Sequence, residues 1–71
     1  MNNTLKNAAR KLYKENNITS GYEHFEIAFD NGVLDYIRDD YCLPRNADEK
    51  FAYMEGVKFA EKNDYSVWDL Y

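Results

Sequence analysis

The sequence predicts an all-α protein, a bundle of three to four short helices, from three observations. Apolar residues recur at helical spacing, β-branched residues are scarce, and clusters of Asn, Asp, Gly and Pro divide the chain into short pieces. The chain has no internal repeat and no linker, so residues 1–71 are expected to form a single small globular domain. Such a domain buries only about 60% of its unfolded surface, and its many aromatic residues offset this because each one buries a large area.

A first amphipathic helix is predicted before Asn16 and Asn17. Asn3 or Thr4 can cap its start. Its apolar residues follow the i, i+3, i+4, i+7, i+8 pattern: Leu5, Ala8, Ala9, Leu12 and Tyr13. Three basic residues recur at i+4 on the opposite face and form a basic stripe: Lys6, Arg10 and Lys14.

Residues 20–41 fit two structures. In the favoured one, a helix begins at a capping box of Ser20 and Glu23 and ends at Gly32, and a second helix covers Val33–Tyr41. We favour this interpretation because Val33, Ile37 and Tyr41 continue at helical spacing.

The alternative for the same region is a β-hairpin. Residues 25–29 and 33–37 would then form two strands joined by a turn at Asn31 and Gly32, packed on the helices in an α+β fold.

A further helix is predicted over Ala47–Lys62, capped by Asn46 together with Glu49. Its broad apolar arc consists of Ala52, Tyr53, Gly56, Val57, Phe59 and Ala60. Ala52 and Gly56 are small enough to let a neighbouring helix approach closely. Phe51 and Met54 fall outside the arc, and we expect residues 65–71, with Trp68 and Tyr71, to fold over them. The expected core of the protein is Leu5, Ala9, Leu12, Phe25, Phe29, Ile37, Tyr53, Val57 and Ala60.

No catalytic machinery can be assembled from these residues, so the chain is expected not to be an enzyme. The one histidine, His24, has no evident catalytic partner. Neither Ser20 nor Ser66 lies in the G-x-S-x-G turn that presents a nucleophilic serine. A dyad of His24 with Cys42 lacks a recognisable flanking sequence, so we expect an exposed histidine and a half-buried structural cysteine.

No cofactor or metal site is expected either. The three glycines are too dispersed for a phosphate-binding loop, and a calcium loop containing Asp30 and Gly32 would need Ile27 as its first ligand. A single cysteine and the absence of a long apolar run indicate a soluble protein of the reducing cytoplasm that does not bind a membrane.

Charge is distributed unevenly along the chain. Residues 1–19 carry four basic residues and one acidic residue, whereas residues 20–71 carry five basic and twelve acidic residues. We interpret the acidic part as a surface that binds a basic region of another protein, acting as a nucleic-acid mimic or inhibitor. The residues expected to contact this partner are Glu26, Asp30, Asp35, Tyr36, Asp39, Asp40 and Tyr41.

Two further interpretations remain open. The basic stripe of Lys6, Arg10 and Lys14 can contact phosphates, which would make the chain a small regulator that binds nucleic acid or ribosomes. A homodimer is also compatible with the sequence.

Two resemblances bear on these interpretations. After Pro44, residues 51–57 (Phe-Ala-Tyr-Met-Glu-Gly-Val) resemble the aromatic, glycine-bearing helix of ribosome modulation factors over about fourteen residues. The chain lacks the strong basic charge with which that family binds ribosomal RNA, so we do not assign it there. In its small size, aromatic content and acidity it is similar to accessory proteins of phages and mobile elements, which is consistent with an inhibitor.

Overall fold

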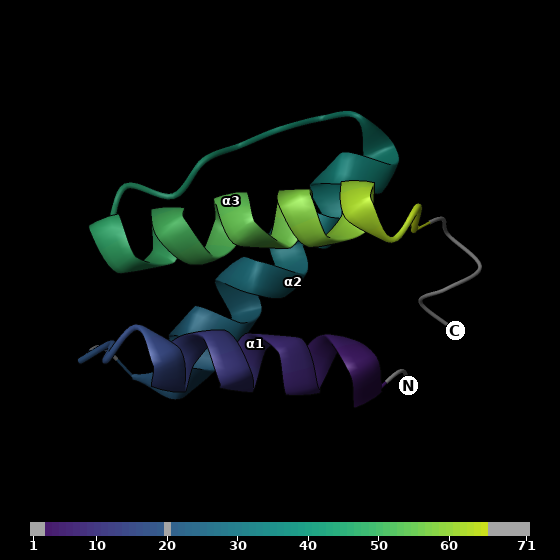
Figure 1. The fold of residues 1–71 in the computed structure, drawn as a ribbon. Helices are drawn as coiled ribbons and strands as arrows, with labels where there is room; N and C mark the ends of the chain where they lie inside the picture. The colour runs from purple at the N-terminus through teal and green to yellow at the C-terminus, as the bar shows by residue number, and fades with distance from the viewer. Residues whose placement is uncertain (1–2, 20, 66–71) are drawn as a thin grey trace.

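The structure is a computed structural model that describes residues 3–19 and 21–65. Three helices make up most of this part of the chain: α1 (Asn3–Glu15), α2 (Tyr22–Arg38) and α3 (Ala47–Lys62). Within the described ranges there is no strand, so the all-α class is confirmed. α2 runs obliquely between the other two helices, and both α1 and α3 pack on it (Figure 1).

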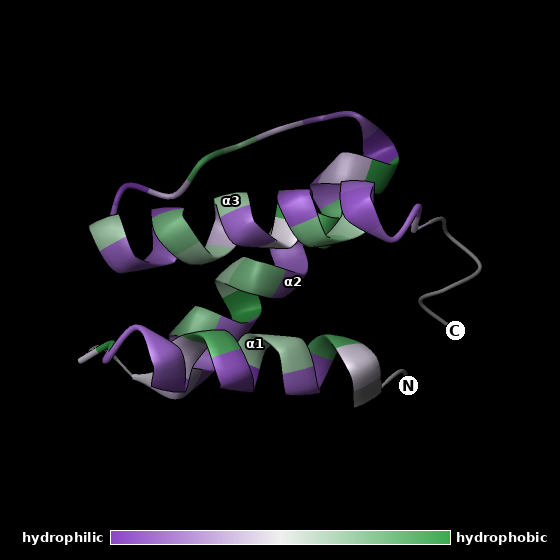
Figure 2. Cartoon of the chain, in the orientation of Figure 1, coloured by the Kyte–Doolittle hydropathy of each residue, from purple (hydrophilic) through white to green (hydrophobic). Residues whose placement is uncertain are grey.

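α1 matches the predicted amphipathic helix. Ala9 is fully buried, and Leu5 and Leu12 pack against the core from its edge. The apolar residues of α1 lie toward α2 and α3, with polar residues on the outer side (Figure 2). At the end of the helix, the backbone N–H and the side-chain amide of Asn16 both donate hydrogen bonds to the Leu12 carbonyl.

α2 corrects the predicted break at Gly32. One helix runs from Tyr22 to Arg38, so residues 25–29 and 33–37 lie in the same helix and the hairpin is not formed. The helix ends three residues before Tyr41 because Asp39 takes the left-handed conformation, with φ of 57°. The predicted capping box involves residue 20, which lies outside the described residues. Gly21 is the N-cap and provides no side-chain hydrogen bond.

Gly32 lies inside α2, at the point where this helix crosses α3. A Cβ atom at Gly32 would overlap the carbonyl oxygen of Tyr53 on α3. Gly56 makes the reciprocal approach, because a Cβ there would overlap the carbonyl oxygen of Phe29 on α2. The predicted close approach at Gly56 is therefore confirmed, and its partner is the backbone of Phe29 in α2.

α3 has the predicted bounds, and Asn46 is its N-cap as predicted, although the Glu49 side chain does not complete a capping box. The Asn46 side chain accepts hydrogen bonds from the backbone amides of Asp48 and Glu49, at 2.9 and 3.1 Å. These bonds satisfy two of the amides that have no partner in the first turn of a helix.

The core draws on all three helices. Its buried apolar side chains are Ala9, Phe25, Ala28, Phe29, Val33, Ala52, Tyr53 and Ala60. Five of these were predicted, while Ala28, Val33 and Ala52 were not. Of the other predicted core residues, Leu5, Leu12 and Ile37 pack at the edge and Val57 is half-buried. Phe25 contacts the Tyr13 ring at 5.4 Å between centroids, and Phe29 contacts the Phe59 ring at 5.7 Å.

Candidate functional site

The C-terminal end of α2 turns the chain back along α3. The backbone amide of Asp39 donates to the Tyr36 carbonyl at 3.2 Å, and that of Asp40 donates to the Asp35 carbonyl at 3.1 Å. These bonds satisfy carbonyls of the last helical turn. Residues 40–45 then pass along the side of α3 that faces away from α1 (Figure 1).

The Tyr53 hydroxyl joins this segment to both helices. Tyr53 is a buried residue of α3, and its hydroxyl donates to Asp35 Oδ2 at 2.5 Å. The same oxygen accepts a hydrogen bond from the backbone amide of Cys42 at 2.9 Å. Burial, followed by the hydrogen bond to Asp35, raises the pKa of Tyr53 to about 12. The hydroxyl therefore keeps its proton, and with it the bond to Asp35, over the physiological range.

An apolar groove, which we call the Tyr41 groove, lies between the returning segment and α3. It has a volume of about 220 Å³ and is lined by Tyr41, Leu43, Tyr53, Met54, Val57 and Lys58. Three of these side chains are unusually exposed for apolar residues: Tyr41 at 50%, Leu43 at 51% and Met54 at 47%. Among the described residues the other large exposed apolar side chain is Ile27, on α2.

Carboxylates surround one end of the Tyr41 groove. The pKa of Tyr41 is raised by desolvation and then by nearby negative charge, including that of Asp39, Glu61 and Asp35. Asp39, Asp40 and Glu61 are exposed and available to a partner, whereas Asp35 is half-buried and bonded to Tyr53. Carboxylates therefore lie at one end of the apolar groove, while Lys58, which pairs with Glu55, lines the groove itself.

The structure does not bring the seven predicted partner-contacting residues into one face. Asp39, Asp40 and Tyr41 lie together beyond the end of α2, and Tyr36 packs partly into the core. The Asp35 side chain points to α3, where it accepts a hydrogen bond from the Tyr53 hydroxyl. The other two residues, Glu26 and Asp30, lie on the part of α2 that faces α1.

Asp30 is a half-buried carboxylate at the contact between α1 and α2. Its Oδ1 atom is buried and has no hydrogen-bond partner among the described residues. Burial and the nearby Glu26 carboxylate raise the pKa of Asp30 to about 6, and the ammonium of Lys6 lowers it. Asp30 thus titrates within reach of neutral pH and is oriented toward α1.

The basic stripe on α1 is exposed but partly engaged with α2. The Arg10 guanidinium lies over the Tyr22 ring, 5.8 Å from its centroid, in a cation–π contact. The Tyr22 hydroxyl donates to Glu26 Oε2 at 2.7 Å, and the Lys6 carbonyl oxygen lies 3.4 Å from the same hydroxyl. Lys14 is exposed at the end of the helix. The basic surface open to a phosphate is therefore smaller than the three charges in the sequence suggest.

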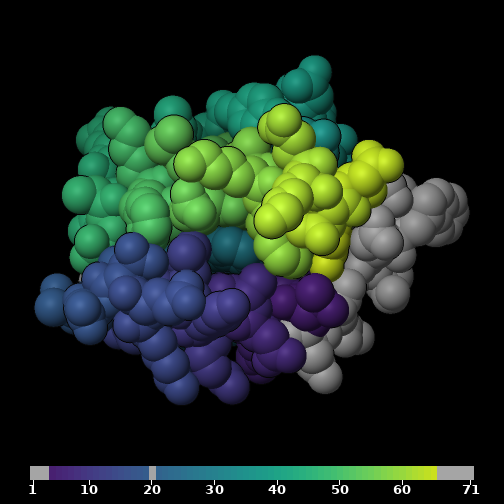
Figure 3. Space-filling view, in the orientation of Figure 1, coloured from purple at the N-terminus to yellow at the C-terminus, as the bar shows by residue number. Residues whose placement is uncertain are grey.

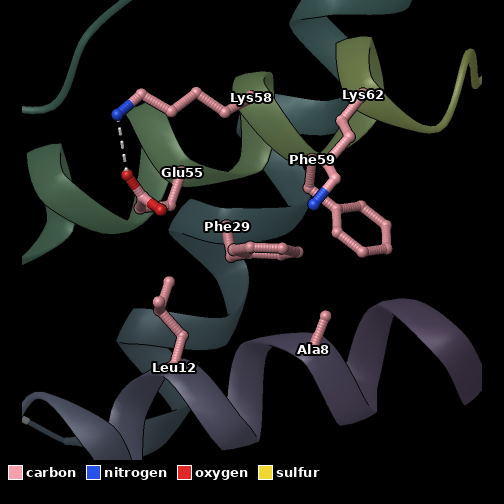
Figure 4. Close-up of a pocket in the computed structure, with 7 residues that line it drawn as sticks. All are labelled: Ala8, Leu12, Phe29, Glu55, Lys58, Phe59 and Lys62. Carbon is pink, nitrogen blue, oxygen red and sulfur yellow. Dashed lines mark hydrogen bonds and ion pairs between the residues drawn. The ribbon is translucent and has the colours of Figure 1, made fainter.

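A second groove separates α1 from α3. It has a volume of about 310 Å³ and is lined by Ala8, Leu12, Phe29, Glu55, Lys58, Phe59 and Lys62. Atoms of α2 are visible at its bottom (Figure 3). Phe29 forms this floor, while Lys58 pairs with Glu55 at 3.1 Å and Lys62 lies along Phe59 (Figure 4). We interpret it as a packing gap, because α1 and α3 both pack on α2 rather than on each other.

The structure separates the residues that could have formed a thiol–imidazole dyad. His24 is near the start of α2 and Cys42 follows its end, and a 17-residue helix is about 25 Å long. His24 is exposed, as expected, but Cys42 is exposed rather than half-buried. In the described part of the chain no group of three or more His, Cys, Asp or Glu side chains could hold a metal ion.

Five residues that line the groove were not predicted as site residues, and neither was the nearby Glu61: Leu43, Tyr53, Met54, Val57 and Lys58. Met54 had the clearest signal, because it falls outside the apolar arc of its helix. The predicted cover of Met54 and Phe51 by residues 65–71 falls mainly on residues outside those described. Tyr65 itself packs on Phe59, with ring centroids 5.3 Å apart.

No family model, curated protein or solved structure matches this chain. In the described ranges, none of the helices is long and apolar enough to cross a membrane.

Proposed function

We propose that this chain is a non-enzymatic protein-binding module that docks on its partner through the Tyr41 groove. One observation carries the proposal: among the described residues, three of the four exposed large apolar side chains surround this groove. Single exposed apolar residues are normal on protein surfaces, whereas a group of them marks an interaction site. Tyrosine and methionine also suit such a site, since both are enriched in the cores of interfaces.

The size of the groove favours a protein as its occupant. At about 220 Å³ it is smaller than the roughly 300–1,000 Å³ typical of pockets for small molecules. One or two apolar side chains of a partner would fill it.

The charge around the groove indicates the chemistry of the partner. Asp39, Asp40 and Glu61 would attract a surface in which Lys or Arg residues flank the inserted apolar side chain. Basic surfaces of this kind are common on proteins that bind nucleic acid. We therefore propose that the chain covers such a surface and acts as an inhibitor of nucleic-acid binding.

Direct binding of nucleic acid or ribosomes through α1 is the competing proposal. The contacts of Arg10 with Tyr22, and the proximity of Lys6 to Asp30, weaken it because they use part of the basic stripe within the molecule. A gel shift with duplex DNA and with RNA at about 50 and 200 mM salt tests it. A shift that weakens steeply with salt would support binding through α1.

The first test of the groove uses a defined probe. A synthetic helical peptide of leucine and lysine, with leucines on one face, is titrated into ¹⁵N-labelled protein, with a leucine–glutamate peptide as control. We expect chemical-shift changes at Tyr41, Leu43 and Met54 with the basic peptide only, and weaker binding as salt is raised.

The matched pair Leu43→Ser and Ile27→Ser distinguishes binding in the groove from non-specific hydrophobic binding. Both substitutions remove an exposed aliphatic side chain, but only Leu43 lines the groove. We expect Leu43→Ser to weaken binding of the basic peptide about tenfold and Ile27→Ser to leave it unchanged. Equal effects of the two substitutions would contradict the proposal, as would a basic peptide that shifts only residues of α2 facing α1.

The same pair then identifies the natural partner. Proteins captured from a lysate are relevant only if Ile27→Ser retains them, Leu43→Ser loses them and the isolated protein has a basic surface. The inhibitor proposal further requires that the chain displaces nucleic acid from that purified protein. If the chain and the nucleic acid bind it simultaneously, the module is a docking domain and not an inhibitor.

A further inference from the structure

The segment that forms one wall of the Tyr41 groove has few bonds that hold it in place. The backbone hydrogen bonds that end α2 stop at the amide of Asp40, and residues 41–45 make no hydrogen bond between backbone groups. Among the described residues, the bond from the Cys42 amide to the Tyr53 hydroxyl is the one hydrogen bond between residues 40–45 and α3. The Tyr53 hydroxyl is therefore the one polar anchor of residues 40–45 on α3 in the described part of the chain.

This oxygen is itself held rigidly. The Tyr53 ring is buried in the core, and its hydroxyl is fixed by donation to Asp35 at the end of α2. Because the hydroxyl donates to Asp35, its lone pairs are free to accept from Cys42. The arrangement links the end of α2, the returning segment and the middle of α3 through one phenol.

The bonded amide lies at the centre of the wall. Cys42 is flanked in the chain by Tyr41 and Leu43, both of which line the groove, whereas its own thiol is exposed to solvent. Met54 follows Tyr53 in α3 and lines the opposite side. Fixing the Cys42 amide on Tyr53 therefore fixes the two wall residues relative to Met54.

We infer that the Tyr53 hydroxyl is a positioning group that forms the docking groove by holding the backbone of Cys42 against α3. This inference rests on the proposed function of the groove. A preformed groove binds more tightly than one that must be ordered on binding, because the cost of ordering the segment has already been met in the free protein. The basic partner would thus meet Tyr41 and Leu43 already in place.

The test compares Tyr53→Phe with Tyr22→Phe. Each substitution removes a phenol hydroxyl that donates to a carboxylate, but the Tyr22 hydroxyl bonds to Glu26 beside the Lys6 carbonyl of α1, away from the groove. Amide hydrogen exchange at Cys42, measured by NMR in the unbound protein, reports on the bond without any partner. We expect Tyr53→Phe to accelerate this exchange about tenfold, and Tyr22→Phe to leave it unchanged.

Two further measurements distinguish a positioning role of the Tyr53 hydroxyl from a general contribution to stability. The melting temperature of Tyr53→Phe should fall by no more than about 10 °C, since the ring still fills the core. Asp35→Asn retains an oxygen that can accept the Tyr53 hydroxyl, so it should keep slow exchange at Cys42, whereas Asp35→Ala should not.

Binding of the leucine–lysine peptide completes the test. We expect Tyr53→Phe to weaken it about tenfold at a temperature where the variant is fully folded. Unchanged exchange at Cys42 would overturn the positioning role, whatever the function of the groove. Faster exchange with unchanged binding would show that the hydroxyl holds the segment but that docking does not use it. Loss of binding in Leu43→Ser would still support the proposed function in either case.

Discussion

Gly56 of α3 lies directly against the backbone carbonyl of Phe29 in α2, with no room for a methyl group between them. Alanine is normally favoured over glycine by about 1 kcal/mol in a helix interior. Here we expect the opposite, because Gly56→Ala would force the two helices apart and lower the free energy of unfolding by about 2–3 kcal/mol. Urea denaturation measures this change.

Gly21→Ala is the matched control for that substitution. A Cβ at Gly21 would meet the His24 side chain at 3.6 Å, which is an ordinary contact, and its φ of −60° suits any residue. We expect a change within about 1 kcal/mol. The account of the crossing would be wrong if both variants were equally stable.

Removal of the Asn46 side chain should destabilise α3 from its first turn. Asn46→Ala loses two hydrogen bonds to the amides of Asp48 and Glu49, and we expect a cost of about 1 kcal/mol. Asn46→Asp retains an acceptor at the same place and should stay within about 0.5 kcal/mol of the wild type. Thermal denaturation of both variants provides the comparison, and an equal loss in the two would argue against the cap.

Asp30 should make stability depend on pH. Folding raises its pKa from 3.8 to about 6, so the folded state binds the proton more tightly than the unfolded state. Its favourable contribution is therefore present below about pH 4 and is lost as pH rises through about 6. Because the carboxylate is only half-buried, the loss is about 1–2 kcal/mol rather than the full value of the shift.

The variant Asp30→Asn isolates this effect, since asparagine resembles the protonated acid. We expect it to match the wild type near pH 4 and to exceed it by about 1–2 kcal/mol at pH 7. Asp40→Asn removes an exposed carboxylate and controls for net charge. A difference between Asp30→Asn and the wild type that stays constant from pH 4 to 7 would rule out titration of Asp30 as the cause.

Filling the groove between α1 and α3 should stabilise the protein. Ala8→Leu would place a larger apolar side chain over Phe29, and burial of part of it is expected to add about 1 kcal/mol. Lys11→Leu, on the exposed side of α1, is the control because lysine and leucine have similar helix propensities. A higher melting temperature for Ala8→Leu alone would confirm that the groove is a packing gap. Equal melting temperatures would contradict this interpretation.

The sequence was sufficient to predict α1 and α3 because local signals determine them. The apolar spacing of α1 and the cap and composition of α3 both act within one helix. The continuity of α2 could not be predicted in the same way. Asp30, Asn31 and Gly32 form a typical turn signal. The reason for a glycine at position 32 is the close approach of Tyr53, which belongs to another helix and lies 21 positions further along the chain.

The candidate site was predicted in part for a similar reason. Tyr41, Asp39 and Asp40 stood out as an exposed aromatic and acidic group, and the structure places them at the end of α2 next to the groove. The division of the acidic residues was not predictable from charge alone. Asp35 bonds to Tyr53 across eighteen positions of the sequence. A substitution such as Asp35→Lys would therefore disturb the fold and could not report on an interface alone.

The crossing of α2 and α3 also bears on how this protein can evolve. Contacts between side chains can drift, because a loss of volume at one core position can be offset by a gain at its neighbour. Contacts between backbones have no such freedom, since Gly32 and Gly56 each face a carbonyl of the other helix. We therefore expect descendants of this chain to exchange Phe25 or Val33 for other apolar residues while both glycines persist. In distant relatives, two glycines separated by 23 intervening positions would then be a more durable sign of common ancestry than the aromatic residues around them.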